Sequence, residues 1–177
     1  MKRNLIAIIL LLAFFKTIAQ DHFVEAQVDS DIVKLPLKIG IRAPYFSATC
    51  IDGKKIKLGD FKGKYVILDF WGSWCKACIN YFPLLKQNYE SKYKDIIEII
   101  GVDCHDSEDS WRKAVKKFDL PWLQIRNVEA IDILEKKYDV WAFPTLILIG
   151  KDGKVLLYDV GGFAGPMDLI DNLESKN

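Results

Sequence analysis

Two cysteines separated by two residues stand between an apolar segment and the start of a helix-like segment. The apolar segment is residues 65–70, and the cysteines are Cys75 and Cys78. Because this spacing lets the two sulfurs meet within the first turn of a helix, the pair can form a disulfide. Cys75 would then lie at the helix N-terminus, where free N–H groups and the helix dipole favour a thiolate. A thiolate is the attacking species in disulfide exchange, so we predict that Cys75 is the nucleophile and Cys78 its resolving partner.

The first 19 residues have the pattern of an export signal. Lys2 and Arg3 precede an apolar run over residues 5–15, and small residues follow at positions 17 and 19. We therefore predict a signal peptide over residues 1–19, cleaved after Ala19. The apolar run is shorter than the roughly 20 residues of a membrane-spanning helix. The alternative is an uncleaved N-terminus that tethers the protein to the membrane.

The rest of the chain divides into a linker and one domain. Residues 20–37 carry scattered charges and no clear periodicity, and we predict a linker there. The patterning becomes regular from residue 38, and half of the 177 residues of the chain are hydrophobic. A chain of this size and composition can form a single hydrophobic core. We therefore predict one globular domain over residues 38–177.

Charge and cysteine content narrow the possible functions. Removal of residues 1–19 takes away three of the 25 basic residues and none of the 24 acidic ones, which leaves 22 basic residues. Basic and acidic residues are then nearly equal in number, at 22 and 24. A nearly neutral chain provides no basic surface for nucleic acid, so no nucleic-acid partner is expected. All four cysteines follow the predicted signal peptide. Export to the periplasm would place them where disulfides form and persist.

Strand-like and helix-like segments alternate along the predicted domain. An Asp52-Gly53 pair between two segments with period-two patterning indicates a β-hairpin near the start of the domain. Further strands are expected over residues 65–71, 96–102, 121–125, 145–149 and 155–160, and helices over residues 75–93, 108–118, 130–138 and 166–174. The expected fold is therefore α/β, with a central mixed β-sheet flanked by helices and an N-terminal β-hairpin extension.

The cysteine motif and residues far from it in the sequence together resemble the thioredoxin fold. The matching positions are Trp74-Cys75-Lys76-Ala77-Cys78, Asp69, Pro83 and Phe143-Pro144-Thr145. More specifically, the chain is similar to the TlpA/ResA-like branch, which comprises exported, often membrane-tethered thiol–disulfide oxidoreductases of bacteria. The segments that carry this similarity are Gly40-x-x-Ala43-Pro44-x-Phe46, the hairpin, Leu58-x-Asp60-Phe61-Lys62-Gly63-Lys64 and Phe70-Trp71.

The resemblance implies roles for four residues besides the cysteines. Asp69, if buried beneath them, would have a raised pKa and would exchange a proton with the second cysteine. The alternative is a partly exposed acid at a strand end. Pro144 corresponds to the cis-proline that faces the cysteines in the family, unless it is only a trans residue that starts a strand. Phe143 would pair through its backbone with an extended substrate, and Trp74 would pack beside the first cysteine.

Lys76 and Ala77 depart from the family pattern, which usually has Pro before the second cysteine. Free N–H donors and the charge of Lys76 predict an acidic Cys75 thiol, which makes a disulfide more oxidising. The family precedent instead favours a reductant of protein disulfides. The direction of electron transfer therefore stays open between oxidant and reductant, with the reductant favoured. The resemblance implies proteins with disulfides or thiols as substrates, and a membrane or periplasmic redox partner that regenerates the pair.

Two other functions are compatible with this fold. A thiol peroxidase of the peroxiredoxin type shares the fold and the Gly-x-x-Ala-Pro-x-Phe segment. However, Gly72 stands where the peroxidatic motif of those enzymes has Thr. A non-catalytic binding module would use the groove beside Pro144 without turnover. Intact cysteines at positions 75 and 78 argue against that module.

The two remaining cysteines, Cys50 and Cys104, have no assigned role. They are either partly buried free thiols or a structural disulfide, or Cys104 lies near the active face as an auxiliary thiol. A zinc site that combines the motif cysteines with Cys104 and His105 matches no usual zinc spacing. Covalent haem attachment requires His directly after the second cysteine, where Ile79 stands. No metal and no cofactor are therefore expected.

Overall fold

The computed structural model of the chain describes residues 39–126, 134–161 and 165–175. The predicted signal peptide and linker lie outside these residues. The helix expected over residues 130–138 is described only from residue 134, and residues 134–138 are helical. Within the described ranges, no helix combines the length and the apolar character needed to cross a membrane.

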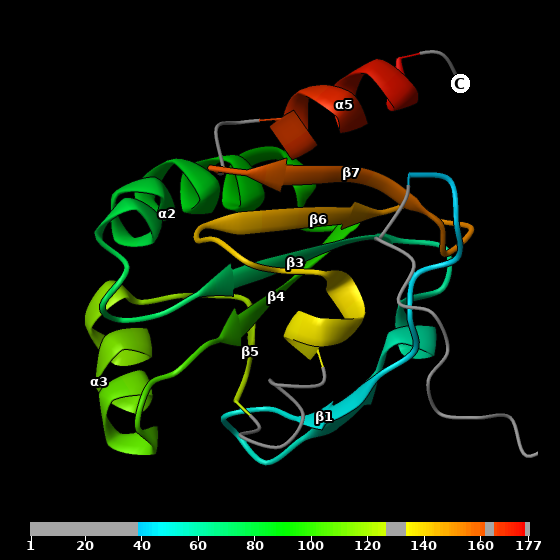
Figure 1. Ribbon diagram of the computed structural model, residues 1–177. Coiled ribbons are helices and arrows are strands. Elements are labelled where there is room, and N and C mark those ends of the chain that lie inside the picture. The colour runs from blue at the N-terminus through cyan, green and yellow to red at the C-terminus, as the bar shows by residue number, and fades with distance from the viewer. Residues whose placement is uncertain (1–38, 127–133, 162–164, 176–177) are drawn as a thin grey trace, which may run out of the picture. The chain divides into compact units, whose positions relative to one another are not determined.

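A five-stranded sheet lies at the centre of the domain, in the order β5-β4-β3-β6-β7 (Figure 1). Its strands are β3 (Tyr65–Trp71), β4 (Ile97–Asp103), β5 (Leu123–Ile125), β6 (Thr145–Ile149) and β7 (Val155–Val160). β3 pairs in parallel with β4 and antiparallel with β6, so the sheet is mixed, as predicted. Every residue of β3 is buried, which is typical of a central strand covered on both faces.

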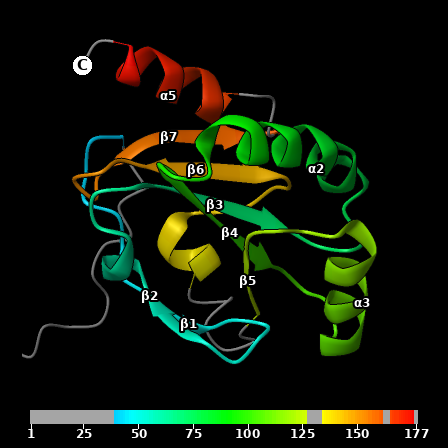
Figure 2. The same ribbon diagram turned by 180° about the vertical axis from the view of Figure 1, so that it is seen from behind.

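Three helices pack on one face of the sheet. They are α2 (Lys76–Asn88), α3 (Glu108–Phe118) and α5 (Gly165–Glu174). Because side chains alternate along a strand, Tyr65, Ile67 and Trp71 of β3 all contribute to this core. The helical residues 134–138 and the N-terminal hairpin contribute to the core on the opposite face (Figures 1 and 2).

The predicted hairpin consists of β1 (Ser47–Thr49) and β2 (Lys55–Lys57), which pair antiparallel. Ala48 and Ile56 face each other across the pair and are both buried. The turn between the strands contains Gly53 with a φ of 86°, a conformation that favours glycine. The Asp-Gly signal in the sequence therefore marks the hairpin correctly.

The helix boundaries follow local signals in the sequence. Ser107 caps α3, and its Oγ accepts a hydrogen bond of 3.1 Å from the main-chain N–H three residues later. A 3-10 helix, η1 (Leu58–Phe61), leads from the hairpin toward β3. Pro83 lies inside α2. The chain then continues as a π-helical turn, η2 (Tyr89–Tyr93), so the helix expected as far as Tyr93 is α-helical only in its first thirteen residues.

Candidate active site

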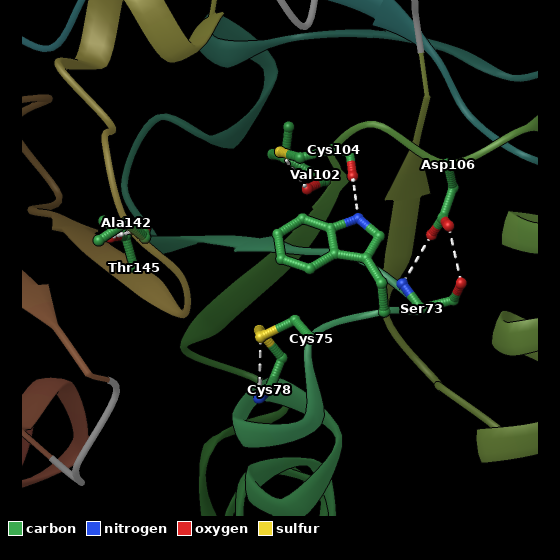
Figure 3. The surroundings of a disulfide bond; sticks show 9 residues. Ser73, Cys75, Cys78, Val102, Cys104, Asp106, Ala142 and Thr145 are labelled. Carbon is green, nitrogen blue, oxygen red and sulfur yellow. Dashed lines mark hydrogen bonds between the residues drawn. A yellow bond between two sulfur atoms is a disulfide. The ribbon is translucent and has the colours of Figure 1, made fainter.

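Cys75 and Cys78 form a disulfide at the junction between β3 and α2 (Figure 3). The sulfur atoms are 1.97 Å apart and the Cα atoms 5.3 Å apart. Cys75 is the N-cap residue of α2, as the spacing predicts, and its Sγ accepts a hydrogen bond of 3.2 Å from the main-chain N–H of Cys78. After reduction, the same N–H group and the helix dipole would stabilise a thiolate on Cys75.

Both cysteines are almost inaccessible in the disulfide form. Cys75 is 5% exposed and Cys78 is 1% exposed, so Cys75 is the more accessible of the two residues. The first turn of α2 contains no acidic residue that would oppose a thiolate. These features suit Cys75 for attack and Cys78 for resolution.

Asp69 lies in the middle of β3, with its side chain on the face shared by Ile67 and Trp71. This face also packs against both cysteines and α2. Asp69 is 1% exposed, and its Oδ2 has no hydrogen-bond partner among the described residues. Burial raises the pKa of this carboxyl group to about 7. The alternative of a partly exposed acid at a strand end is therefore wrong.

Trp74, which directly precedes Cys75, and Phe143, which directly precedes Pro144, form an aromatic pair. The Phe143–Pro144 peptide bond is cis, as the resemblance implies. Trp74 and Phe143 meet edge to face with ring centres 5.2 Å apart, and Phe143 packs against the core cluster that contains both cysteines. Trp74 is 52% exposed, so part of its indole remains available to a partner. Trp71, by contrast, is fully buried and belongs to the core.

His105 borders this aromatic pair, a position that was not predicted from the sequence. Its ring centre lies 6.4 Å from that of Trp74 and 6.1 Å from that of Phe143. Its Nε2 lies 3.0 Å from Oε1 of Glu135. Among the described residues, no three His, Cys, Asp or Glu side chains are grouped as a metal site would require.

Three further polar residues near the disulfide were not identified from the sequence: Ser73, Asp106 and Arg126. Ser73 donates hydrogen bonds from its main-chain N–H and its hydroxyl to the two carboxylate oxygens of Asp106 (Figure 3). Arg126 donates to the main-chain oxygen of Asp106. A signal was available, because the residues that follow parallel strands β3 and β4 must emerge at the same edge of the sheet.

Cys50 and Cys104 are buried free thiols, so the alternative of a structural disulfide between them is wrong. Burial raises the pKa of both thiols. The Cys104 thiol donates to the main-chain oxygen of Val102. The main-chain oxygen of Cys104 accepts a hydrogen bond of 3.0 Å from the indole of Trp74. Cys104 therefore contacts the active-site loop through its backbone.

The sheet order and the disulfide at a helix N-terminus define a thioredoxin-like protein. A family model described as thioredoxin-like matches residues 63–155. The thiol–disulfide oxidoreductase ResA of Bacillus thuringiensis subsp. konkukian is 38% identical over 155 residues, which cover 87% of this chain and 83% of that protein. ResA of Geobacillus thermodenitrificans is 31% identical over 173 residues, or 98% of this chain and 93% of that protein.

Solved structures agree with these relatives. The thioredoxin domain of a thiol–disulfide oxidoreductase from Bacteroides vulgatus has a TM-score of 0.68 at 29% identity, covering 78% of this chain and 97% of that one. A putative thiol:disulfide interchange protein DsbE from Chlorobium tepidum has a TM-score of 0.69 at 28% identity, with the same coverage. The chain belongs to the family of thioredoxin-like thiol–disulfide oxidoreductases, and the predicted enzyme class is confirmed.

Proposed function

We propose that the protein reduces disulfides of other exported proteins through a mixed disulfide on Cys75 that Cys78 resolves. The observation that carries the mixed-disulfide mechanism, with Cys75 as the attacking thiol, is the N–H of Cys78 that points at Sγ of Cys75, at the start of a helix without acidic residues in its first turn. This arrangement lowers the cost of a thiolate on one of the two sulfurs and not on the other.

The reaction transfers two electrons in two exchange steps. The Cys75 thiolate attacks one sulfur of a substrate disulfide, and the other substrate sulfur leaves as a thiolate that takes up a proton. The Cys78 thiol then loses its proton and attacks Sγ of Cys75 in the mixed disulfide. This second step releases the remaining substrate thiolate and leaves the Cys75–Cys78 disulfide.

Asp69 is the group that we assign to the proton of Cys78. It lies on the sheet face that packs against both cysteines, and its pKa is raised to about 7 by burial. A carboxyl group with a pKa near the working pH can accept a proton and return it in the next cycle. No donor among the described residues competes for its Oδ2.

The same carboxyl group favours the reductant direction. A negative charge beneath the cysteines opposes a thiolate there, and a reduced form with a less stable thiolate gives up its electrons more readily. The positive charge of Lys76 would instead stabilise a thiolate on Cys75. The Lys76 side chain is exposed, however, so water and salt screen its charge.

Trp74 and Phe143 supply the contacts that we assign to the substrate. Their rings meet edge to face next to the disulfide, and half of the Trp74 surface is open to solvent. Aromatic side chains of this kind provide contact area at low cost in conformational entropy. Phe143 and Pro144 would face an extended substrate segment.

Export and regeneration complete the proposal. We assign residues 1–19 to a signal peptide, residues 20–37 to a linker and residues 38–177 to the thioredoxin-like domain. The protein would act in the periplasm, either free or tethered through an uncleaved N-terminus. A membrane or periplasmic redox partner would return two electrons to the Cys75–Cys78 disulfide after each turnover.

A reductase assay on a model protein disulfide tests the assignment of the cysteines. Cys75→Ser should abolish turnover, and Cys78→Ser should accumulate mixed disulfides on Cys75. Cys50→Ser is the matched control and should retain activity, because Cys50 is a buried free thiol in the hairpin region. Full activity of Cys75→Ser would refute the proposed nucleophile.

The direction is tested by the reduction potential of the pair. Titration against thiol–disulfide buffers should give a value nearer to the roughly −270 mV of thioredoxin than to the roughly −120 mV of the oxidant DsbA. A value at the oxidising end would contradict the reductant direction and would leave the reaction class intact.

A further inference from the structure

The loop that carries Cys75 is attached at two consecutive residues to the segment that follows β4. Ser73 donates to Oδ2 of Asp106 from its main-chain N–H over 2.6 Å and to Oδ1 from its hydroxyl over 2.7 Å. Trp74 donates from its indole to the main-chain oxygen of Cys104 over 3.0 Å (Figure 3). The two residues before Cys75 are therefore fixed by partners about 30 positions away in the sequence.

Asp106 is itself held in place from the opposite side. Arg126, which directly follows β5, donates to the main-chain oxygen of Asp106 from Nε over 3.1 Å and from Nη2 over 2.7 Å. The carboxylate of Asp106 thus faces Ser73, and its backbone faces the guanidinium group. The segments that follow strands β3, β4 and β5 each contribute one member of this chain of contacts, and the order of the strands in the sheet brings the members together.

Asp103, the last residue of β4, lies next to this contact and is completely buried. Neither of its carboxyl oxygens accepts a hydrogen bond from the described residues, and Nε of Arg126 is 3.7 Å from Oδ2. An ionised carboxylate without a hydrogen-bond donor is costly in such a place. A proton on Asp103 would remove this cost, and the carboxylate of Asp106 is the group that would accept a hydrogen bond from it.

The pKa values of the two carboxyl groups move in opposite directions, as a shared proton requires. Burial, followed by the hydrogen bond and the charge of Asp106, raises the pKa of Asp103 to about 9, against the charge of Arg126. Burial alone would raise the pKa of Asp106, but its hydrogen bonds with Asp103 and Ser73 and the charge of Arg126 outweigh burial and lower it.

We infer that Asp103 and Asp106 share one proton and act as positioning residues, which hold Ser73 and thereby orient Cys75 for attack. Neither carboxyl group touches the reacting sulfurs. The inference rests on Cys75 as the attacking thiol, as proposed above. It adds a pair of acidic residues to the site, at the contact between Ser73 and the segment that follows β4.

The ionisable groups around Asp103 and Asp106 determine the pH range in which Asp106 holds Ser73. Asp103 faces the Asp106 carboxylate and the Arg126 guanidinium, and Cys104 beside it is a neutral thiol because burial, Glu135, Asp103 and Asp69 all raise its pKa. When Asp103 loses its proton, two carboxylates share one guanidinium group. Repulsion between them then weakens the hold on Ser73, so the contact loosens as the pH rises above about 9.

The amide proton of Ser73 reports this contact directly in ¹H–¹⁵N NMR spectra of the full chain in its disulfide form. A short hydrogen bond to a carboxylate should place its resonance far downfield, and the resonance should move upfield as Asp103 ionises. Asp106→Asn should remove the downfield position at every pH. Asp103→Asn should keep the downfield position of the Ser73 resonance, because an amide N–H replaces the shared proton. The same substitution should abolish the upfield movement of this resonance at high pH, because Asn does not ionise.

Turnover supplies the second measurement. Asp106→Asn should lower kcat/KM of the reductase reaction at pH 7 by about tenfold, because the loop of Cys75 is displaced. Asp109→Asn is the matched control, since this exposed acid of α3 pairs with Lys113 and not with the loop. Thermal unfolding of each variant separates displacement of the loop from loss of fold.

The outcomes separate this inference from the proposed function. An unchanged Ser73 resonance in Asp106→Asn, or a high-pH movement that persists in Asp103→Asn, would overturn the shared proton. A wild-type rate in folded Asp106→Asn would overturn the positioning role. Activity of Cys75→Ser would instead remove the nucleophile assignment, and the Ser73 resonance would still report on the carboxyl pair.

Discussion

Trp71 donates a hydrogen bond of 3.1 Å from its indole Nε1 to Oε1 of Gln124, and both side chains are buried. Trp71 ends β3 and Gln124 lies in β5, with β4 between them. Gly101 of β4 stands opposite Gln124 in the register, and a Cβ atom at this position would overlap the Gln124 side chain. The absence of a side chain at Gly101 therefore allows Gln124 to reach Trp71.

Gly101→Ala should destabilise the protein by roughly 1–3 kcal/mol, the usual cost of overpacking in a close-packed core. The Gln124 side chain would have to move away from the new Cβ atom, and the indole N–H of Trp71 would then lose its hydrogen-bond acceptor. Urea unfolding measures the loss. Gly59→Ala is the control, because its Cβ would meet nothing within 4 Å. Equal stability of the two variants would contradict this account.

Asp69→Asn should increase stability, and the gain should grow with pH. Asp69 has a folded-state pKa of about 7 against a usual value of 3.8. Between these values the folded state binds a proton that the unfolded state has released, so wild-type stability falls as pH rises through this window. The full difference between these two pKa values corresponds to a change of about 4 kcal/mol at most in the free energy of unfolding. Unfolding of both proteins in their disulfide form at pH 4 and pH 8 measures it, and a gain that does not depend on pH would contradict the prediction.

The same substitution should slow the resolving step of catalysis. Without the Asp69 carboxylate, Cys78 must release its proton to water, so the mixed disulfide on Cys75 should accumulate, and turnover at pH 7 should fall by roughly 10²-fold. Acid quenching followed by mass spectrometry detects the intermediate. Attack by Cys75 should proceed at close to the wild-type rate, and a mixed disulfide that decays as fast as in the wild type would exclude Asp69 as the proton acceptor.

Cys50 and Cys104 should resist alkylation in the folded protein. Both thiols are buried, and burial raises the pKa of each, so few thiolates are available at neutral pH. After reduction, iodoacetamide at pH 7 should modify Cys75 first and should reach the two buried thiols only in urea. Peptide mapping by mass spectrometry identifies the sites. Rapid modification of Cys104 in the folded protein would restore the alternative of an auxiliary thiol.

Much of the fold was predictable because its signals are local. The Asp52-Gly53 turn, the cap at Ser107 and the apolar run of β3 each follow from a few neighbouring residues. The end of the first helix was less predictable, since its sequence remains helical to Tyr93 and does not distinguish an α-turn from a π-turn.

The sequence by itself determined the chemistry of the site. Two cysteines at the spacing of one helical turn, after a buried strand, define a disulfide with one favoured nucleophile, because helix termini expose N–H groups whatever the rest of the fold. Tertiary structure decided the environment of that disulfide. Burial on both faces of the sheet sets the pKa of Asp69. The parallel register of β3 and β4 brings Ser73 to Asp106 across 33 residues, a contact that local sequence cannot encode because it depends on which strands become neighbours.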